Sequence, residues 1–279
     1  MMGTIADKLV YLDETKQDLR RALAIRGVSV DGATPFRQYT SGVHSLAWAP
    51  DLLFQNSEQG VFYYPLPQFL YQDAAGTVPV TVDGDPVGYM QDLSGNNNHA
   101  TQSVSEARPL YRTDGTLHWL EFDGADDYLN SGYVAGGAGN TLSAAGEIAN
   151  NYNILLGTQD GGGRLFLAQG EGLGSAGWGD ASYSTITGGS GVGKRVLLLT
   201  GKTGDVLFRN NGVDAYSGAP TGNPNTVNPL YVGAHNLGGT PSDYTTGTLY
   251  GAIAMQQQLV SADVIAVEQY LANLAGIQL

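Results

Sequence analysis

From residue 51 onward the chain is divided into short segments by clusters of turn-forming residues, such as SGNNN at 94–98 and RNNG at 209–212. Glycine takes left-handed backbone angles freely, and Asn and Asp side chains close turns on their own backbone. The chain has 40 glycines in 279 residues, roughly twice the average usage. Turns this frequent leave room for strands rather than long helices. The pattern therefore predicts a mainly β chain folded as an antiparallel β-sandwich.

The segments between these turns are the predicted strands. They are Gly60–Tyr64, Val78–Val82, Gly88–Leu93, Leu117–Phe122, Tyr152–Gly157, Arg164–Gln169, Arg195–Thr200, Asp205–Arg209 and Leu230–Gly233. Within this part of the chain, helical spacing appears only over Ser261–Leu274, where Val264, Ile265, Val267, Tyr270, Leu271 and Leu274 form one apolar face. We expect Ser261 to cap this short helix and Gly276 to end it.

The N-terminal region has a different composition. Residues 4–26 contain no Gly or Pro, and Gly27 follows as a stop signal. Apolar residues recur there at heptad spacing, at Ile5, Leu9, Leu12, Leu19 and Leu23. Two interpretations stay open: a helix packed on its own domain, or an attachment helix that self-associates. We expect a helical segment over 1–46, a linker at 47–50 and a sandwich domain over 51–279.

Charge and composition exclude several classes of function. The formal net charge is −13, so a nucleic-acid backbone would be repelled. The absence of cysteine excludes disulfides and thiolate metal sites. The sequence has no signal-peptide pattern and no apolar stretch of about 18 residues. We therefore expect no nucleic-acid partner and no membrane insertion.

GGSGVGKR at 188–195 resembles a phosphate-binding loop. Such a loop must leave a strand and open a helix, whose N-terminal amides hold the phosphates. Here an apolar, strand-like run follows, and Arg195 stands where a magnesium-binding Ser or Thr is required. We interpret the segment as a hairpin turn.

Several motifs resemble one known family. They are GDPVG at 84–88, DLSGNNNHATQ at 92–102, ARPLYRTDG at 107–115, EFDGADDYL at 121–129, LYVGAHN at 230–236 and the closing segment 247–277. Together they resemble the concanavalin A-like (laminin G-like) jelly-roll domain found in bacteriophage virion proteins. Residues 4–46 are similar to an N-terminal helical segment of phage tail and baseplate-associated proteins.

This resemblance implies a non-enzymatic structural protein of the virion, assembled in the host cytoplasm. Its N-terminal helices would attach it to other virion proteins of a tail, baseplate or appendage, as a homo-oligomer and most simply a trimer. The jelly roll would bind a host-surface glycan or pack against its neighbours. A purely structural decoration protein is a further alternative.

Aromatic residues beside short polar ones are the expected glycan contacts, because their flat faces stack on the apolar side of a sugar ring. The glycine-rich stretch 171–190 holds Trp178, Asp180 and Tyr183, which we interpret as a flexible binding loop. The alternative is that Trp178 folds back onto the sandwich. Trp119 lies in an alternating segment and is expected in the core or between the sheets.

Asp92, Asn96, Asn97 and Asn98 form a second candidate site. Gly95 and the Asn residues can adopt left-handed angles, and Asp92 can accept hydrogen bonds from turn amides. The structural interpretation is a closed turn, and the functional one is binding of calcium or sugar hydroxyls. For Asp126 and Asp127 the alternatives are turn residues or calcium ligands. No EF-hand-like spacing supplies the six to eight oxygens that calcium takes, so we expect no cofactor.

A glycan depolymerase on the same fold is the enzyme alternative. Glycoside hydrolysis needs two carboxylates that flank the scissile bond. No two glutamates share a predicted strand; Glu121 and Asp123 point the same way but lie at the entry to a turn. The four histidines show no paired spacing. We therefore expect no catalytic residues.

Overall fold

The computed structural model describes residues 15–17, 50–148, 153–160, 163–170, 173–179, 184–190, 193–220, 222, 224 and 226–279. The predicted heptad residues Ile5, Leu9, Leu12, Leu19 and Leu23 lie outside these ranges. From the expected N-terminal helical segment only Thr15–Gln17 are described, and these three are helical. No helix in the described ranges is long and apolar enough to cross a membrane.

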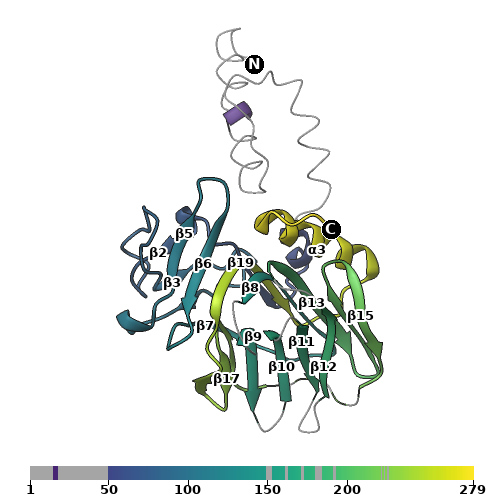
Figure 1. Ribbon diagram of the computed structural model, residues 1–279. Helices are drawn as coiled ribbons and strands as arrows, with labels where there is room; N and C mark the ends of the chain where they lie inside the picture. Colours follow the sequence, from purple (N-terminus) through teal and green to yellow (C-terminus); the bar gives the residue numbers. More distant parts are fainter. Residues whose placement is uncertain are drawn as a thin grey trace, which may run out of the picture.

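Two β-sheets packed face to face form the body of the molecule, as the sequence predicted (Figure 1). Within the described residues the first sheet has eight strands in the order β15-β14-β13-β8-β19-β6-β5, with β1 also paired to β19. The second has eleven, in the order β12-β11-β10-β9-β16-β7-β4-β3-β2, with β17 paired to β9 and β18 paired to β17. The pairings are antiparallel except that of β17 with β9. This arrangement is consistent with a jelly roll.

The strands of the first sheet are β1 (Gly60–Tyr63), β5 (Leu110–Thr113), β6 (His118–Asp123), β8 (Asn140–Ile148), β13 (Arg195–Lys202), β14 (Asp205–Asn210), β15 (Val213–Gly218) and β19 (Thr246–Met255). The second sheet holds β2 (Leu70–Tyr71), β3 (Tyr89–Met90), β4 (Ala100–Thr101), β7 (Leu129–Val134), β9 (Asn153–Asp160), β10 (Gly163–Gly170), β11 (Leu173–Gly179), β12 (Ser184–Ser190), β16 (Pro229–Val232), β17 (His235–Leu237) and β18 (Thr240–Ser242). The helices are the 3-10 helices η2 (Pro50–Phe54), η3 (Pro67–Phe69) and η4 (Ser105–Ala107), and the α-helix α3 (Ser261–Ala275).

The main core lies between the two sheets. Every second residue of the long strands points into it, as in β6, where Leu120 and Phe122 are buried in this cluster. Because side chains alternate along a strand, Trp119, Glu121 and Asp123 point to the opposite, outer face of the first sheet. The two faces of β6 thus separate the core from a polar surface.

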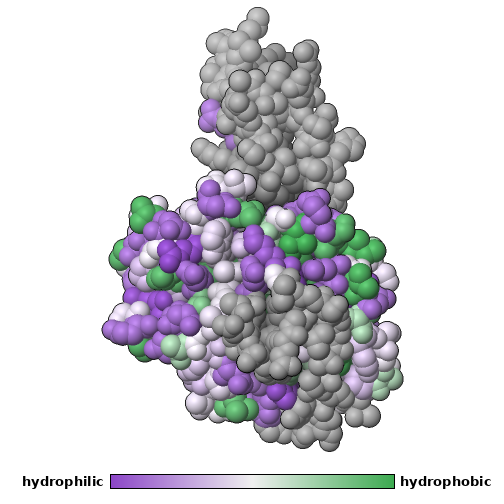
Figure 2. Space-filling model, viewed as in Figure 1, coloured by the Kyte–Doolittle hydropathy of each residue, from purple (hydrophilic) through white to green (hydrophobic). Residues whose placement is uncertain are grey.

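A second apolar cluster covers part of that outer face. Helix α3 packs against β8, β13 and β19, and η2 joins it through Leu53 and Phe54 (Figure 1). Gly251 of β19 makes this close approach possible, because an added Cβ would lie 2.8 Å from a methyl carbon of Leu274. In Figure 2, hydrophobic residues gather over α3 at the upper right, while hydrophilic residues dominate the left of the view, over β2, β3 and β5.

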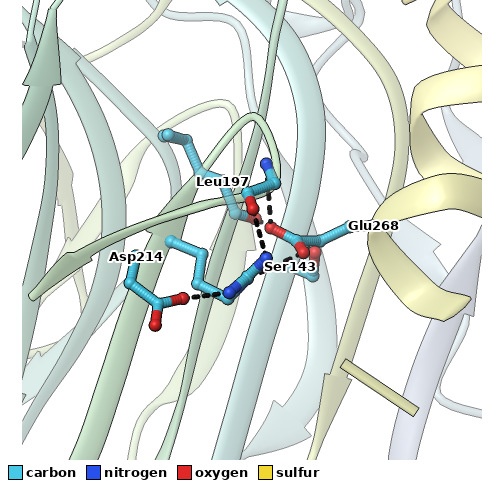
Figure 3. Close-up of polar contacts among 6 residues, drawn as sticks. Ser143, Leu197, Asp214 and Glu268 are labelled. Atoms are coloured by element: carbon cyan, nitrogen blue, oxygen red, sulfur yellow. Dashed lines mark hydrogen bonds and ion pairs between the residues drawn. The ribbon is translucent and has the colours of Figure 1, made fainter. Parts of the chain in front are cut away.

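A buried ion pair fixes α3 to the sheet (Figure 3). Arg209 of β14 donates from Nε to Glu268 of α3 at 2.8 Å, and its other nitrogens reach Asp214 of β15 and the carbonyl of Gly212. The Glu268 carboxylate also accepts the Gly212 amide at 3.3 Å. Burial raises the pKa of Glu268, and the charge of Arg209 opposes that rise.

The predicted strands are largely confirmed, with two corrections. Val78–Val82 is no strand: Pro79 forms only an isolated bridge to Tyr71, consistent with a residue that has no amide to donate. Gly88–Leu93 shortens to Tyr89–Met90. The glycine-rich stretch 171–190 is not one long loop, because most of it forms β11 and β12. Gly177 is required there, since an added Cβ would lie 2.0 Å from the Phe166 ring.

The phosphate-loop-like segment leads out of β12 into β13, and no helix follows it. This confirms that the match is accidental. The predicted hairpin is wrong, however, because β12 and β13 belong to different sheets. The chain therefore passes from the second sheet to the first between the end of β12 and the start of β13.

The C-terminal helix is confirmed over Ser261–Ala275, and Gly276 ends it in the left-handed conformation at φ 69°. Two details differ from expectation. Val260, not Ser261, occupies the N-cap position, and no side chain caps the helix. Ile265 points to solvent, whereas Val264, Val267, Leu271 and Leu274 are buried.

Candidate functional site

The outer face of the first sheet carries a partly exposed tryptophan where β5 and β6 pair. Trp119 of β6 lies opposite Arg112 of β5 and rests on the buried Tyr250, with ring centroids 5.6 Å apart. Its inner edge packs against the apolar cluster under α3. The ring is thus held rigidly at the end of that cluster, with part of its surface open to solvent.

Beside Trp119, three neighbouring strands place polar residues in one row. Thr248 of β19 pairs with Glu121 of β6 on one side and with Glu147 of β8 on the other. Directly paired residues of an antiparallel sheet share a face, so the two carboxylates flank the threonine. The Thr248 hydroxyl is buried and has no hydrogen-bond partner among the described residues. A buried polar atom of this kind normally has a partner.

At the β6 end of this row, the Glu121 carboxylate has a charged partner, Arg112. Arg112 donates from Nε to Glu121 at 2.5 Å and from Nη1 to Asp83 at 3.3 Å. These carboxylates raise the pKa of Arg112. The Glu121 side chain is 46% exposed, so it can accept further hydrogen bonds. Among the described residues, the Glu147 carboxylate has no hydrogen-bond partner.

We call Arg112, Trp119, Glu121, Glu147 and Thr248 the Trp119 face. It combines an apolar ring with two carboxylate hydrogen-bond acceptors, those of Glu121 and Glu147. Such a set can stack on the apolar side of a sugar while accepting bonds from its hydroxyl groups. These five residues lie on β5, β6, β19 and β8, which are adjacent strands of the first sheet. The sheet, rather than a loop, therefore fixes the distances between them.

The Trp119 face continues into an acidic turn made of Asp123, Asp126 and Asp127. One ligand atom from each of the three lies within 4.8 Å of the others. Asp127 accepts the Asp123 amide at 3.0 Å, and Asp123 accepts that of Ala125 at 2.7 Å. The interpretation of Asp127 as a turn residue is thereby confirmed.

The acidic turn is also electrostatically unfavourable. Burial raises the pKa of Asp127 to about 6, and the charges of Asp123, Asp126 and Glu121 add to that rise. Three carboxylates fall short of the six to eight oxygens that calcium takes. The expectation that the chain needs no cofactor stays a prediction.

The predicted binding loop around Trp178 is corrected by the structure. Trp178 lies in β11, its side chain is 0% exposed, and it belongs to the core between the sheets. Its indole donates to the carbonyl of Gly222 at 3.3 Å. The alternative interpretation, that this tryptophan folds back onto the sandwich, is the correct one. Asp180 and Tyr183 lie outside the described residues.

The second predicted site is a closed structural turn. Asp92 is buried and accepts amide bonds from Phe62 at 3.0 Å, Ser94 at 2.9 Å and Asn98 at 3.0 Å. Asn96 and Asn98 donate to backbone carbonyls, including that of Gly60. The left-handed angles predicted here are confirmed at Gly95 (φ 88°) and Asn97 (φ 60°). A ligand at this turn would have to replace bonds that are already made, and of the four candidate residues only Asn97 is exposed.

Sequence reasoning missed the Trp119 face. The expectation that Trp119 lies in the core or between the sheets is wrong, because its ring is on the outer face of the first sheet. The glutamates lie on different strands, so their spacing along the sequence does not indicate a pair. The pairing of β6 and β8 with β19 brings together residues 26 and more positions apart in the chain. The alternation in LHWLEFD at 117–123 could have indicated that Trp119 and Glu121 share a face.

Comparison with known proteins identifies the fold but no family. No family model matches the chain, and no curated protein is significantly similar to it in sequence. Among solved structures, the binding domain of Paraclostridial Mosquitocidal Protein 1 has a TM-score of 0.50 at 14% identity, covering 66% of this chain and 50% of that one.

Two further similar structures have lower scores. The receptor binding domain of botulinum neurotoxin D has a TM-score of 0.46 at 13% identity, covering 64% of this chain and 49% of that one. A sialidase from Trypanosoma rangeli has a TM-score of 0.49 at 14% identity, covering 78% of this chain and 33% of that one. The chain thus matches half or less of the length of each of these proteins. At such identities the likeness concerns the β-sandwich fold alone.

Proposed function

We propose that this chain is a non-enzymatic glycan-binding protein whose β-sandwich binds sugar at the Trp119 face. The observation that carries the proposal is the partly exposed Trp119 ring, held on Tyr250 beside the row Glu121–Thr248–Glu147. The ring supplies an apolar platform, and the carboxylates of Glu121 and Glu147 supply acceptors for sugar hydroxyl groups. A rigid sheet preorganises these groups, which limits the entropy lost on binding.

The test is a glycan array followed by calorimetry on the full chain. We expect Trp119→Ala to weaken binding of any array ligand at least tenfold, and Trp119→Phe to weaken it less. Tyr216→Ala is the matched control, because β15 lies at the opposite edge of the same sheet from β5. Unchanged affinity in a folded Trp119→Ala protein would refute the site, and an array without ligands would refute the function.

The proposal extends to a setting in a bacteriophage virion. Its support is the resemblance of residues 51–279 to jelly-roll domains of virion proteins, together with the heptad spacing of residues 5–23. In that setting residues 1–46 attach the protein to a tail, baseplate or appendage as a homo-oligomer, most simply a trimer, and the Trp119 face meets the host-surface glycan. Sedimentation of the full chain and of a variant lacking residues 1–46 tests the oligomer. If both are monomers, the attachment role of the segment is lost.

A glycan depolymerase is the second candidate, and one observation favours it. Glu121 and Glu147 lie on one face with a single strand between them, so their Cα atoms are about 9.6 Å apart by strand spacing. Inverting glycosidases place their two carboxyl groups about 6.5–9.5 Å apart. Incubation with the array ligand and measurement of reducing ends separates the two. We expect no release; release that Glu121→Gln and Glu147→Gln both abolish would establish the enzyme.

A further inference from the structure

The second sheet carries a row of directly paired residues that runs across five of its strands. Tyr71 of β2 pairs with Tyr89 of β3, and Tyr89 pairs with Thr101 of β4. Thr101 in turn pairs with Asn130 of β7, and Asn130 pairs with Tyr231 of β16. Directly paired residues of an antiparallel sheet share a face. We call these five residues the second-sheet row.

The row faces away from the first sheet. Each of its members has a chain neighbour in the core between the sheets: Leu70, Met90, Ala100, Leu129 and Leu230. Because side chains alternate along a strand, the members themselves point to the opposite, outer side. The second-sheet row and the Trp119 face therefore lie on opposite sides of the sandwich and are separate surfaces.

An aromatic group stands at the β2–β3 end of the row. The ring centroids of Tyr71 and Tyr89 are 5.4 Å apart, and that of His99 lies 5.0 Å from Tyr89. All three side chains are partly exposed. The Asp92 amide donates to Nδ1 of His99 at 3.1 Å, which holds the imidazole in place beside the tyrosines. This end of the row thus offers a fixed aromatic platform to solvent.

A second aromatic group stands at the β16 end. Tyr128 packs on the buried Tyr231 at a centroid distance of 4.8 Å, and Tyr244 follows at 6.4 Å from Tyr128. Tyr128 and Tyr244 are partly exposed. The segment that holds Tyr244 is bonded to this sheet, because the Thr245 hydroxyl donates to the Ile154 carbonyl at 2.7 Å. This group is therefore a second platform on the same outer face.

Between the two platforms the row presents polar groups that carry no charge. Among the described residues, the Thr101 hydroxyl and the side-chain nitrogen of Asn130 have no hydrogen-bond partner. No member of the row is charged, although the chain has a formal net charge of −13. Strands β3 and β16 are three strand spacings apart, which is about 14 Å. Such a surface suits an uncharged, hydroxyl-rich ligand that is longer than one ring.

From this placement we infer that the second-sheet row is a second glycan-binding surface, which takes an uncharged oligosaccharide lying across β3, β4, β7 and β16. The class of ligand rests on the proposed glycan-binding function. The Trp119 face offers carboxylates, whereas the row offers neutral groups, and hydrogen bonds to charged groups are roughly twice as strong. The row is therefore the weaker of two surfaces, and the chain holds one glycan on each side of the sandwich.

The experiment measures the binding that remains when the Trp119 face is disabled. The full chain with Trp119→Ala is applied at high concentration to an array of neutral and charged oligosaccharides of graded length, and the retained ligands are measured by calorimetry. We expect neutral oligosaccharides whose affinity rises with length. Adding Tyr89→Ala should weaken the longest of them about tenfold. Adding Thr101→Val, which replaces the hydroxyl with a methyl group, should weaken it about fivefold. Tyr216→Ala, on the first sheet, is the control and should change nothing.

The failures are distinguishable. If Trp119→Ala retains no ligand, or if Tyr89→Ala and Thr101→Val leave the retained ligands unaffected, the second surface is refuted and the Trp119 site stands. Retention of charged sugars, or of single sugars as tightly as longer ones, overturns the class of ligand inferred for the row. A loss in Tyr89→Ala alone, together with a lower thermal unfolding temperature, assigns that ring to the fold and counts against the surface. Absence of any ligand for the wild type overturns both proposals.

Discussion

Replacing Glu268 with alanine should destabilise the protein strongly, although the residue lies on the surface helix α3. Its side chain is 2% exposed and that of Arg209 is 15% exposed, so the substitution leaves a guanidinium with little access to water. Removing one partner of a buried ion pair costs about 3–5 kcal/mol. Arg209 keeps its second partner, Asp214, whose side chain is 60% exposed. We therefore expect the lower end of that range, about 3 kcal/mol.

Urea unfolding at pH 7 measures this cost, with Asp214→Asn as the matched control. The control removes the exposed partner and should cost less than about 1 kcal/mol. A double-mutant cycle with Arg209→Ala should give a coupling of at least about 1.5 kcal/mol, because the two groups touch. Equal losses in Glu268→Ala and Asp214→Asn, or a coupling near zero, would refute the claim that this pair fixes α3 to the sheet.

Three further predictions concern the sandwich itself. Gly177→Ala should destabilise it by about 1–3 kcal/mol, because the new methyl group meets the Phe166 ring; an unchanged urea midpoint would contradict the packing described for β11. Asp92→Ala should lower the free energy of unfolding by at least about 2 kcal/mol, because it leaves three backbone amides unpaired. Asn97→Gly should be neutral or stabilising, because Asn97 has a left-handed backbone angle that glycine adopts freely. Similar losses of stability in both variants would refute the assigned roles. Asp127 has a pKa raised to about 6, so its contribution to stability is present at pH 4 and is lost as the pH rises through 6. Asp127→Asn should therefore gain on the order of 2 kcal/mol over the wild type between pH 4 and pH 7, and a difference independent of pH would contradict the assignment.

The fold could be predicted from the sequence because the residues that form a turn are neighbours in the chain. Gly95, Asn97 and Gly276 have the left-handed angles that their residue types predict, and the turns they make delimit strands. Strands without apolar alternation escaped detection, as at β11, where LGSAGWG uses small residues to admit the Phe166 ring from a neighbouring strand. Such a choice depends on a residue elsewhere in the chain, so local propensity does not reveal it.

The candidate site could not be predicted from the sequence, for a related reason. Glu121, Thr248 and Glu147 become neighbours only through the order β8-β19-β6, and strand order cannot be read from spacing along the chain. Trp178 misled the prediction because glycines flank it, and glycine neighbours were interpreted as a loop. In β11 one of these glycines, Gly177, instead leaves space for Phe166 of the paired strand β10.

A structure of the full chain with its strongest array ligand bound tests the account most directly. We predict a sugar ring stacked on Trp119, with hydroxyl groups donating to Glu121 and Glu147. A ligand held instead by the segment that contains Asp180 and Tyr183, or on the second sheet alone, would contradict it.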